Sequence, residues 1–246
     1  MTVPAEPLPF DADIASAAAL IADSTRAAIL RALLPDRPLA AGELARLAGV
    51  SAATASFHLA KLLDGGMITV VRQGRHRYYR LAGHEVAAAL EALGQISPGL
   101  PVRSLRQSRE AAALDEARTC YDHLAGKAGV ELLDGMLRRG LLEEKSGQTD
   151  RGDTSSLRFE VTGAGTKELG SFGLNLLQLR RSRRHFAGTC IDWTQRRRHL
   201  NGALAAAITS RLFELGWIEH GQRRRSVRVT PVGIEGLAST FGIDLP

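Results

Sequence analysis

Cysteine is scarce in this chain of 246 residues, which contains only Cys120 and Cys190. Two cysteines cannot build a disulfide scaffold, and the free thiol is their default state in a reducing cytosol. Long apolar runs are also missing, since no stretch approaches the roughly 18 to 20 residues of a membrane span. Residues 1–10 lack a basic segment followed by an apolar one, so we expect no secretory signal. We therefore expect a cytoplasmic protein with no membrane partner.

Recognised catalytic motifs are absent too, which argues against an enzyme. What the chain does have is an apolar content of 44%, enough for a real core in one large domain or two ordinary ones. Its 32 Lys and Arg residues, nearly all Arg, exceed 26 Asp and Glu and give a net charge of +6. Because the planar guanidinium matches phosphates and guanine edges, this balance favours a polyanionic partner.

The N-terminal third predicts four helices in succession. Apolar residues recur at helical spacing over 13–22, and Asp23 and Ser24 are good N-cap types for a second helix that Pro35 ends. After a loop over 36–39, residues 42–48 predict a short helix with Leu44 and Leu47 facing inward. Ser51 then caps a helix over 52–63. A helix, a tight turn with Gly49 and a second helix form a helix-turn-helix pattern.

A basic hairpin follows. Beyond residue 66 the apolar period changes from helical to alternating, and Gly74 lies at the centre of the expected turn. At this place a wing would reach phosphates or the minor groove beside a major-groove helix, although a solvated hairpin is the simpler alternative. The basic side chains on or beside the hairpin are Arg72, Arg75, His76, Arg77 and Arg80.

Three motifs in this order resemble the ArsR family of bacterial repressors over roughly residues 10–96. They are the entry helix Ile21-Ala22-Asp23-Ser24-Thr25-Arg26, the recognition helix Ser51-x-x-Thr54-x-Ser56-x-His58-Leu59 and the wing Arg72-Gln73-Gly74-Arg75-His76-Arg77-Tyr78-Tyr79-Arg80-Leu81. The resemblance implies a winged helix-turn-helix and a homodimer, with residues 13–22 and 84–93 at its interface. Two-fold symmetry then predicts a palindromic operator in double-stranded DNA, with half-sites about one helical turn apart.

The DNA-contacting residues that we expect come from the recognition helix and the wing. Family members often have polar residues where this chain has Ala52 and Phe57, which could instead contact thymine methyl groups. Phe57 could equally be a core residue, and His58 fits a role in holding the helix better than one in reading a base. The full set is Ser51, Ala52, Thr54, Ser56, Phe57, His58, Lys61, Arg72, Arg75, His76 and Arg77.

Neither familiar metal site of the ArsR family carries over. Residues 43–48, on the helix before the recognition helix, contain no cysteine. The last dimer helix offers only His84 and Glu85, which cannot make a four-ligand site unaided.

The C-terminal half is an internal duplication. Residues 96–101 read as a linker, so we place a DNA-binding and dimerisation domain at 1–97 and a regulatory domain at 98–246, with repeats at about 103–175 and 176–246. Thr119-Cys120-x-Asp122 recurs as Thr189-Cys190-x-Asp192, and Phe159-Glu160-Val161-Thr162 precedes Gly165 as Arg228-Val229-Thr230-Pro231 precedes Gly233. Each repeat resembles a pared-down winged helix, so the predicted fold class is mainly α with short β-hairpins.

Matching residues of the two repeats should converge at a pseudo-two-fold axis. The ligand-type residues at equivalent positions are Cys120, Asp122, His123, Cys190, Asp192 and His199. They could bind a metal, haem or a small organic molecule, or act as a thiol redox sensor. Alternatively the cysteines are small buried residues and the Asp and His side chains hold helix ends. The Arg runs at 180–184, 196–198 and 223–225 read as solvated, with a second DNA contact as the alternative.

These features together predict a nucleoid-associated, homodimeric repressor that an effector in the C-terminal domain releases from DNA. A transcriptional activator would have the same sequence features. An architectural protein that binds DNA without sequence preference is the other alternative.

Overall fold

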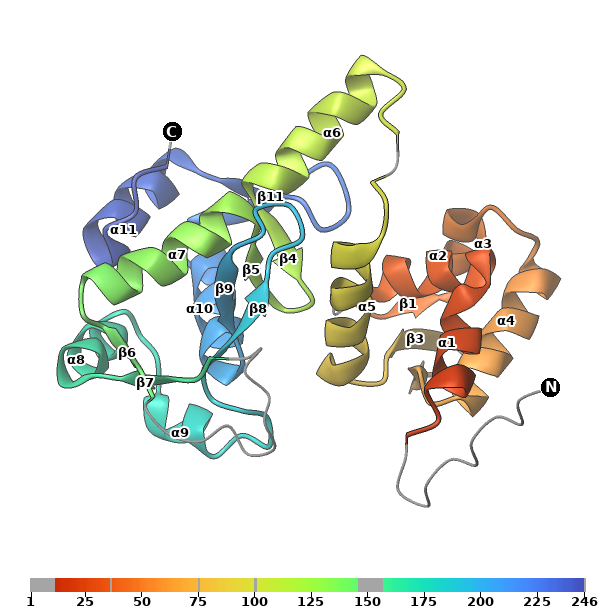
Figure 1. Ribbon diagram of the computed structural model, residues 1–246, viewed down its shortest axis with the longest axis horizontal. Helices are drawn as coiled ribbons and strands as arrows, with labels where there is room; N and C mark the ends of the chain where they lie inside the picture. Colours follow the sequence, from red (N-terminus) through yellow and green to blue (C-terminus); the bar gives the residue numbers. More distant parts are fainter. Residues whose placement is uncertain (1–11, 36, 75, 100, 146–156, 246) are drawn as a thin grey trace, which may run out of the picture. The chain divides into compact units, whose positions relative to one another are not determined.

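The computed structural model describes residues 12–35, 37–74, 76–99, 101–145 and 157–245. The chain forms two compact units that divide between Val86 and Ala87. The predicted fold class is confirmed, since helices predominate and every sheet is a small antiparallel one (Figure 1). No helix in the described ranges has both the length and the apolar character needed to cross a membrane.

The first unit is a winged helix-turn-helix. Asp23 accepts a hydrogen bond from the Arg26 N–H and so begins the second helix, and Gly49 ends the third in a left-handed conformation. Between the second and third helices lies a short strand, where the sequence predicts only a loop. The elements are α1 (Ile14–Ala22), α2 (Ser24–Leu33), β1 (Leu39–Ala40), α3 (Ala41–Ala48), α4 (Ala52–Asp64), β2 (Ile68–Gln73) and β3 (His76–Leu81).

Two features of this unit differ from the sequence prediction. Strand β1 pairs with β3, Leu39 opposite Tyr79, and makes the wing a three-stranded sheet in the order β1-β3-β2. In α3, Leu44 is buried as expected but Leu47 is 38% exposed, and Ala45 is buried in its place. The expectation for Leu47 was wrong because α3 turns Leu44 and Ala45, rather than Leu44 and Leu47, toward its neighbours.

Helix α5 (His84–Ile96) follows the wing and crosses the division between the units. From Ala87 onward it packs with the C-terminal unit, where the Glu91 carboxylate is buried and paired with Arg225. The unit boundary therefore falls inside this helix. The boundary that the linker composition predicts lies later, after Ser97.

The second unit repeats one order of elements, which is a hairpin, a helix, a second hairpin and a second helix (Figure 1). Helix α6 (Leu105–Glu116) precedes the first copy, and α9 (Leu176–Arg180) separates the copies. The first copy is β4 (Arg118–Cys120), β5 (His123–Ala125), α7 (Gly126–Arg138), β6 (Leu142–Glu144), β7 (Phe159–Val161) and α8 (Gly163–Ser171). The second is β8 (Gly188–Ile191), β9 (Arg198–Asn201), α10 (Ala203–Glu214), β10 (Ile218–His220), β11 (Val227–Val229) and α11 (Pro231–Phe241).

The same polar device joins the last helix of each copy to its central helix. Thr162 Oγ1 accepts from the Gly165 N–H at 2.9 Å and donates to the Gly140 carbonyl at 2.6 Å. Thr230 Oγ1 likewise accepts from the Gly233 N–H at 3.0 Å and donates to the Gly216 carbonyl. Each capped helix thus begins against the turn that ends the central helix of its own copy.

The two copies also exchange contacts. Helix α7 of the first copy packs on β9 of the second, and α10 of the second packs on β5 of the first. Thr209 on α10 accepts a hydrogen bond from the Leu124 N–H in β5 at 2.9 Å. One apolar core, which includes Leu132, Met136, Leu204 and Ile208, is shared by both copies. The crossed packing brings hairpins β4–β5 and β8–β9 next to each other, as Figure 1 shows.

Candidate functional site

The recognition helix α4 presents an exposed polar face at its N-terminus. Ser51 caps the helix by accepting from the Thr54 N–H at 3.1 Å, and the two hydroxyl groups lie 2.9 Å apart. On the opposite face Ala55, Leu59 and Leu62 are buried against the unit core. The residues of this helix and its cap that we predicted to contact DNA and that are exposed are Ser51, Ala52, Thr54, Ser56, Phe57 and Lys61.

Phe57 and His58 take opposite positions on this helix. Phe57 is 57% exposed, so the core reading was wrong for it, and the Lys61 ammonium lies 4.6 Å from its ring centroid. His58 is 9% exposed, and its Nδ1 lies 3.5 Å from the Asp23 carboxylate, which caps α2. His58 therefore lies between α4 and the N-terminus of α2 and is withdrawn from the exposed face. That position agrees with the helix-holding role that we expected and argues against a base contact.

The wing concentrates positive charge at its tip. Strands β2 and β3 place Arg72 opposite Arg77 and Gln73 opposite His76, with Gly74 in the left-handed region at φ 58°. Like charges directly opposite one another destabilise a hairpin, so this arrangement favours an anionic ligand. Among the described residues, no carboxylate forms an ion pair with Arg72 or Arg77. Arg75 lies outside the described residues.

A second constellation lies in the C-terminal unit, where the strand registers bring cysteine and histidine together. Cys120 is the cross-strand partner of His123 in β4–β5, and Cys190 is that of His199 in β8–β9. Cross-strand partners have neighbouring side chains, so each hairpin carries one thiol beside one imidazole. The four ligand-type atoms of these residues all lie within 4.8 Å of one another. We call this group the Cys/His cluster.

The cluster is enclosed. Cys120, His123 and His199 are buried, while Cys190 is partly exposed. The two imidazole rings stack with centroids 5.2 Å apart. Both ring nitrogens of His199 are buried without a hydrogen-bond partner among the described residues. Because buried polar atoms are nearly always partnered in folded proteins, His199 points to a missing interaction.

The two aspartates stand behind the histidines. Asp122 Oδ1 lies 3.2 Å from His123 Nδ1, and Asp122 is also paired with Arg184. Asp192 Oδ2 lies 3.8 Å from His199 Nδ1 and accepts from Arg118 at 2.8 Å and from the Gly126 N–H at 2.7 Å. Asp122 is therefore within hydrogen-bond distance of an imidazole, whereas Asp192 lies just beyond it, and each carboxylate is itself neutralised by a guanidinium.

These neighbours shift the pKa values of the cluster in different directions. The hydrogen bond with the Cys120 thiol, followed by one with His123, lowers the pKa of Cys190 to about 3, whereas the same contact and burial raise that of Cys120. Burial opposes the charged form of His123, but hydrogen bonds to Asp122 and Cys190 outweigh it and raise the pKa to about 9. Burial and the nearby charge of His123 lower the pKa of His199 to about 3. A cysteine with a lowered pKa beside two imidazoles is typical of metal-binding and redox sites.

Comparison with known proteins identifies the kind of protein to which these sites belong. Residues 21–71 match a family described as a helix-turn-helix domain. Over 221 residues the chain is 42% identical to the uncharacterized HTH-type transcriptional regulator YdfF of Bacillus subtilis (strain 168), an alignment that covers 90% of this chain and 93% of that protein. The chain belongs to the HTH-type transcriptional regulators. The helix-turn-helix and the class of DNA-binding transcriptional regulator, both expected from the sequence, are confirmed.

Solved structures similar to this regulator include two bacterial proteins. Reduced HlyU from Vibrio cholerae N16961 is 28% identical, covers 35% of the regulator and 90% of its own chain, and gives a TM-score of 0.32. NolR from Sinorhizobium fredii is 29% identical, covers 35% of the regulator and 86% of its own chain, and also gives a TM-score of 0.32.

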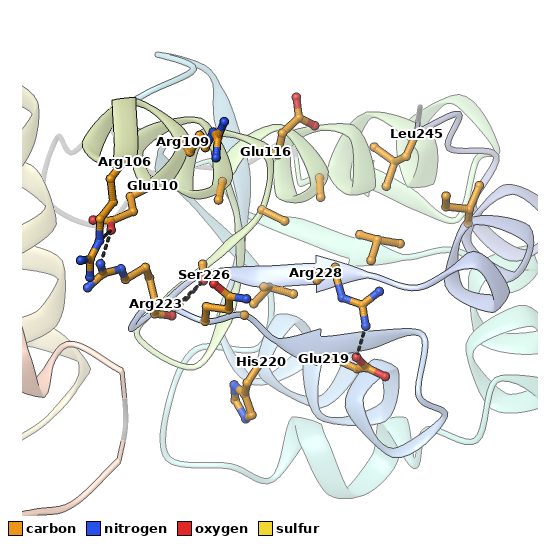
Figure 2. Close-up of a pocket in the computed structure, with 18 residues that line it drawn as sticks. Arg106, Arg109, Glu110, Glu116, Glu219, His220, Arg223, Ser226, Arg228 and Leu245 are labelled. Carbon is orange, nitrogen blue, oxygen red and sulfur yellow. Dashed lines mark hydrogen bonds and ion pairs between the residues drawn. The ribbon is translucent and has the colours of Figure 1, made fainter. Parts of the chain in front are cut away.

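A separate hollow lies elsewhere in the C-terminal unit. It has a volume of about 1130 Å³ and is lined by α6 and by the hairpin β10–β11 (Figure 2). Two groups of its charged side chains are ion-paired in Figure 2: Glu110 pairs with both Arg106 and Arg223, and Arg228 pairs with Glu219. Three of its arginines are therefore already ion-paired, which makes this hollow a weaker candidate for an anion than the Cys/His cluster is for a cation.

Sequence reasoning missed the arginines that hold the C-terminal unit together. Arg118 is fully buried, with its guanidinium on Asp192 and 4.7 Å from the Trp193 ring centroid. The Arg runs that we expected to be solvated include Arg184, paired with Asp122, and Arg225, paired with buried Glu91. Charge runs in the sequence gave no sign of this, because each carboxylate partner lies far away along the chain.

Proposed function

We propose that the regulator is a homodimeric repressor that binds a palindromic operator and is released by an effector bound in its C-terminal unit. It would act at the nucleoid in the cytoplasm. The observation that carries this proposal is the exposed polar face of α4 beside an arginine-tipped wing whose described arginines lack carboxylate partners. A solvated structural hairpin would gain nothing from placing two arginines opposite each other.

In this proposal α4 reads base edges in the major groove and the wing contacts the backbone or the minor groove. Thr54, Ser56 and Lys61 supply hydrogen bonds, while Ala52 and Phe57 contact thymine methyl groups. Ser51 fixes the start of the helix, and His58 positions it through Asp23. The wing contacts come from Arg72, Arg75, His76 and Arg77.

Helix α1 supports the dimer. Ser16 is its sole polar residue, yet none of its residues is buried and Ile14 is 75% exposed. A helix that is apolar all round needs a partner surface, and a second copy of the chain supplies one by two-fold symmetry. We place the dimer contact on α1 and on the exposed face of α5 that includes Leu93.

Footprinting on the DNA upstream of the regulator's own gene tests operator binding. A protected palindrome that is bound far more tightly than random DNA is the expected result, and Ser56→Ala should weaken binding to it more than binding to random DNA. Equal affinity for both DNAs would instead indicate an architectural protein. Transcription from the same promoter in a purified system distinguishes a repressor from an activator. Transcript levels that rise when the regulator is added would overturn the proposal of a repressor.

Sedimentation tests the dimer with a matched pair of variants. Ile14→Glu places a charge on the apolar helix α1 and should convert the dimer to a monomer. Leu177→Glu changes an equally exposed leucine, at 76%, in the C-terminal unit and should leave the dimer intact. A dimer that survives Ile14→Glu would place the interface elsewhere.

A further inference from the structure

The Cys/His cluster has the composition of a closed metal site. Two cysteine sulfurs and two imidazoles form the Cys₂His₂ set that binds Zn²⁺ tetrahedrally. In such a site the ligand atoms stand roughly 3.3 to 3.8 Å apart, given metal–ligand bonds of about 2.0 to 2.3 Å. The four atoms here already lie within 4.8 Å of one another, so side-chain rotations that move each atom by about an ångström would bring them to tetrahedral spacing.

The surroundings of the cluster fit a cation as well. Histidines that bind metals usually donate their other ring nitrogen to a carboxylate. The Nδ1 of His123 lies 3.2 Å from Asp122 and that of His199 lies 3.8 Å from Asp192, so both Nδ1 atoms face a carboxylate. Both Nε2 atoms are buried without a hydrogen-bond partner among the described residues and are available to a ligand. With two thiolates, a divalent ion makes a neutral complex, and neutral groups are cheaper to bury than charged ones. Asn201 further donates to the Cys190 sulfur at 3.0 Å, as outer hydrogen bonds to metal thiolates do.

From these observations we propose that Cys120, His123, Cys190 and His199 bind one Zn²⁺ ion per chain, which joins the two repeats of the C-terminal unit. Each repeat supplies one thiolate and one imidazole, so neither can complete the coordination alone. All four positions are filled by protein side chains, which makes the site a structural or regulatory one rather than a catalytic one. The partly exposed side at Cys190 gives the ion its way in.

The cluster also has a direct connection to helix α5. Gln95 Nε2 donates to the carbonyl of Ile191, the residue after Cys190, at 2.8 Å. Arg225 donates from Nε to the carbonyl of Thr119, the residue before Cys120, at 3.0 Å and is ion-paired with Glu91. Drawing the two hairpins together around an ion would therefore shift the contacts of α5. Helix α5 begins directly after the wing strand β3, so a shift in its contacts can reach the wing. Zinc is then the effector that releases the regulator from DNA, a step that rests on the proposed function.

Metal content after purification and dialysis tests the site in the full-length regulator. We expect one zinc per chain, and we expect Co²⁺ to replace it with the thiolate charge-transfer band and the visible spectrum of a tetrahedral site. Cys190→Ser and His199→Gln should lose the metal, whereas the matched control His220→Gln, which changes a histidine outside the cluster, should keep it. Absence of bound zinc and of any cobalt spectrum in the reduced wild-type protein would overturn the proposal.

Two further measurements keep the result independent of how well the variants fold. Chelator should lower the thermal stability of the wild-type protein, and added Zn²⁺ should restore it and protect both thiols from a thiol reagent. A stable Cys120–Cys190 disulfide that forms in mild oxidant even with zinc present would show a redox pair instead, and would overturn the metal site.

The regulatory step has its own readout. Zinc should weaken operator binding by a factor within the usual allosteric range of about 5 to 150. Glu91→Gln should keep one zinc per chain but lose most of this effect, because the ion pair to Arg225 is broken. Operator affinity that does not change with zinc would overturn the effector role. Loss of operator binding in every metal state would instead mean that the proposed function has failed.

Discussion

Replacing Arg77 by Ala should make operator binding markedly less sensitive to salt. Arg72 and Arg77 face each other at the wing tip, both exposed, so both can approach one duplex. Each phosphate contact contributes about 0.9 to the slope of log affinity against log salt concentration. A dimer has two wings, so Arg77→Ala should lower the slope by about 1.8, and the double variant with Arg72→Ala should lower it by about 3.6.

The consequence is large enough to measure by fluorescence anisotropy with labelled operator DNA. Between about 50 and 200 mM salt, a slope lower by about 1.8 means that the variant loses roughly tenfold less affinity than the wild type does. The charge-matched control is Arg228→Ala, which removes one positive charge in the C-terminal unit, where Arg228 pairs with Glu219. An unchanged slope in Arg77→Ala, or an equal decrease in the control, would refute the wing as a DNA contact.

The remaining predictions concern stability and base reading. Asp192→Asn, studied with chelator present, leaves a fully buried arginine without its counter-charge and should cost about 3 to 5 kcal/mol of unfolding free energy in urea titrations; Glu219→Gln breaks an exposed ion pair and should cost at most about 1 kcal/mol. Gly233→Ala would push a Cβ into the Trp217 carbonyl and should cost about 1 to 3 kcal/mol, so an unchanged melting temperature would contradict the close approach. Phe57→Ala should weaken operator binding without changing the melting temperature. A large loss of stability would instead show that Phe57 contributes to the core.

Much of the N-terminal unit could be predicted from the sequence because its signals are local. Asp23 and Ser51 cap their helices through bonds to residues three positions ahead, and Gly74 makes the turn of the wing. Strand β1 was missed, since two residues carry no periodic pattern and are defined only by pairing with β3. The orientation of Leu47 was missed for a similar reason, because which side of a short helix is covered depends on its neighbours.

The buried ion pairs of the C-terminal unit could not be predicted. Arg118 and Asp192 are 74 positions apart, and nothing next to either residue indicates that the guanidinium is buried. Glu91 and Arg225 are 134 positions apart and belong to different elements, α5 and the β10–β11 hairpin loop. A charged residue in a sequence is most simply predicted to be exposed. Its burial becomes possible only when folding brings an oppositely charged partner close enough to offset the loss of hydration.

Local patterns in the sequence were enough to predict the helices of the N-terminal unit, the position of the wing after them, and which residues of the two repeats are equivalent. Caps, turns and strand periods act over a few residues, and a duplication is visible wherever two segments share a pattern. The sequence predicted that the six matching residues converge, but the tertiary structure was needed to show that the cysteines and histidines form the cluster while the aspartates stand behind the histidines. That outcome depends on strand register and on the crossed packing of α7 on β9 and α10 on β5, which join segments that no local interaction connects.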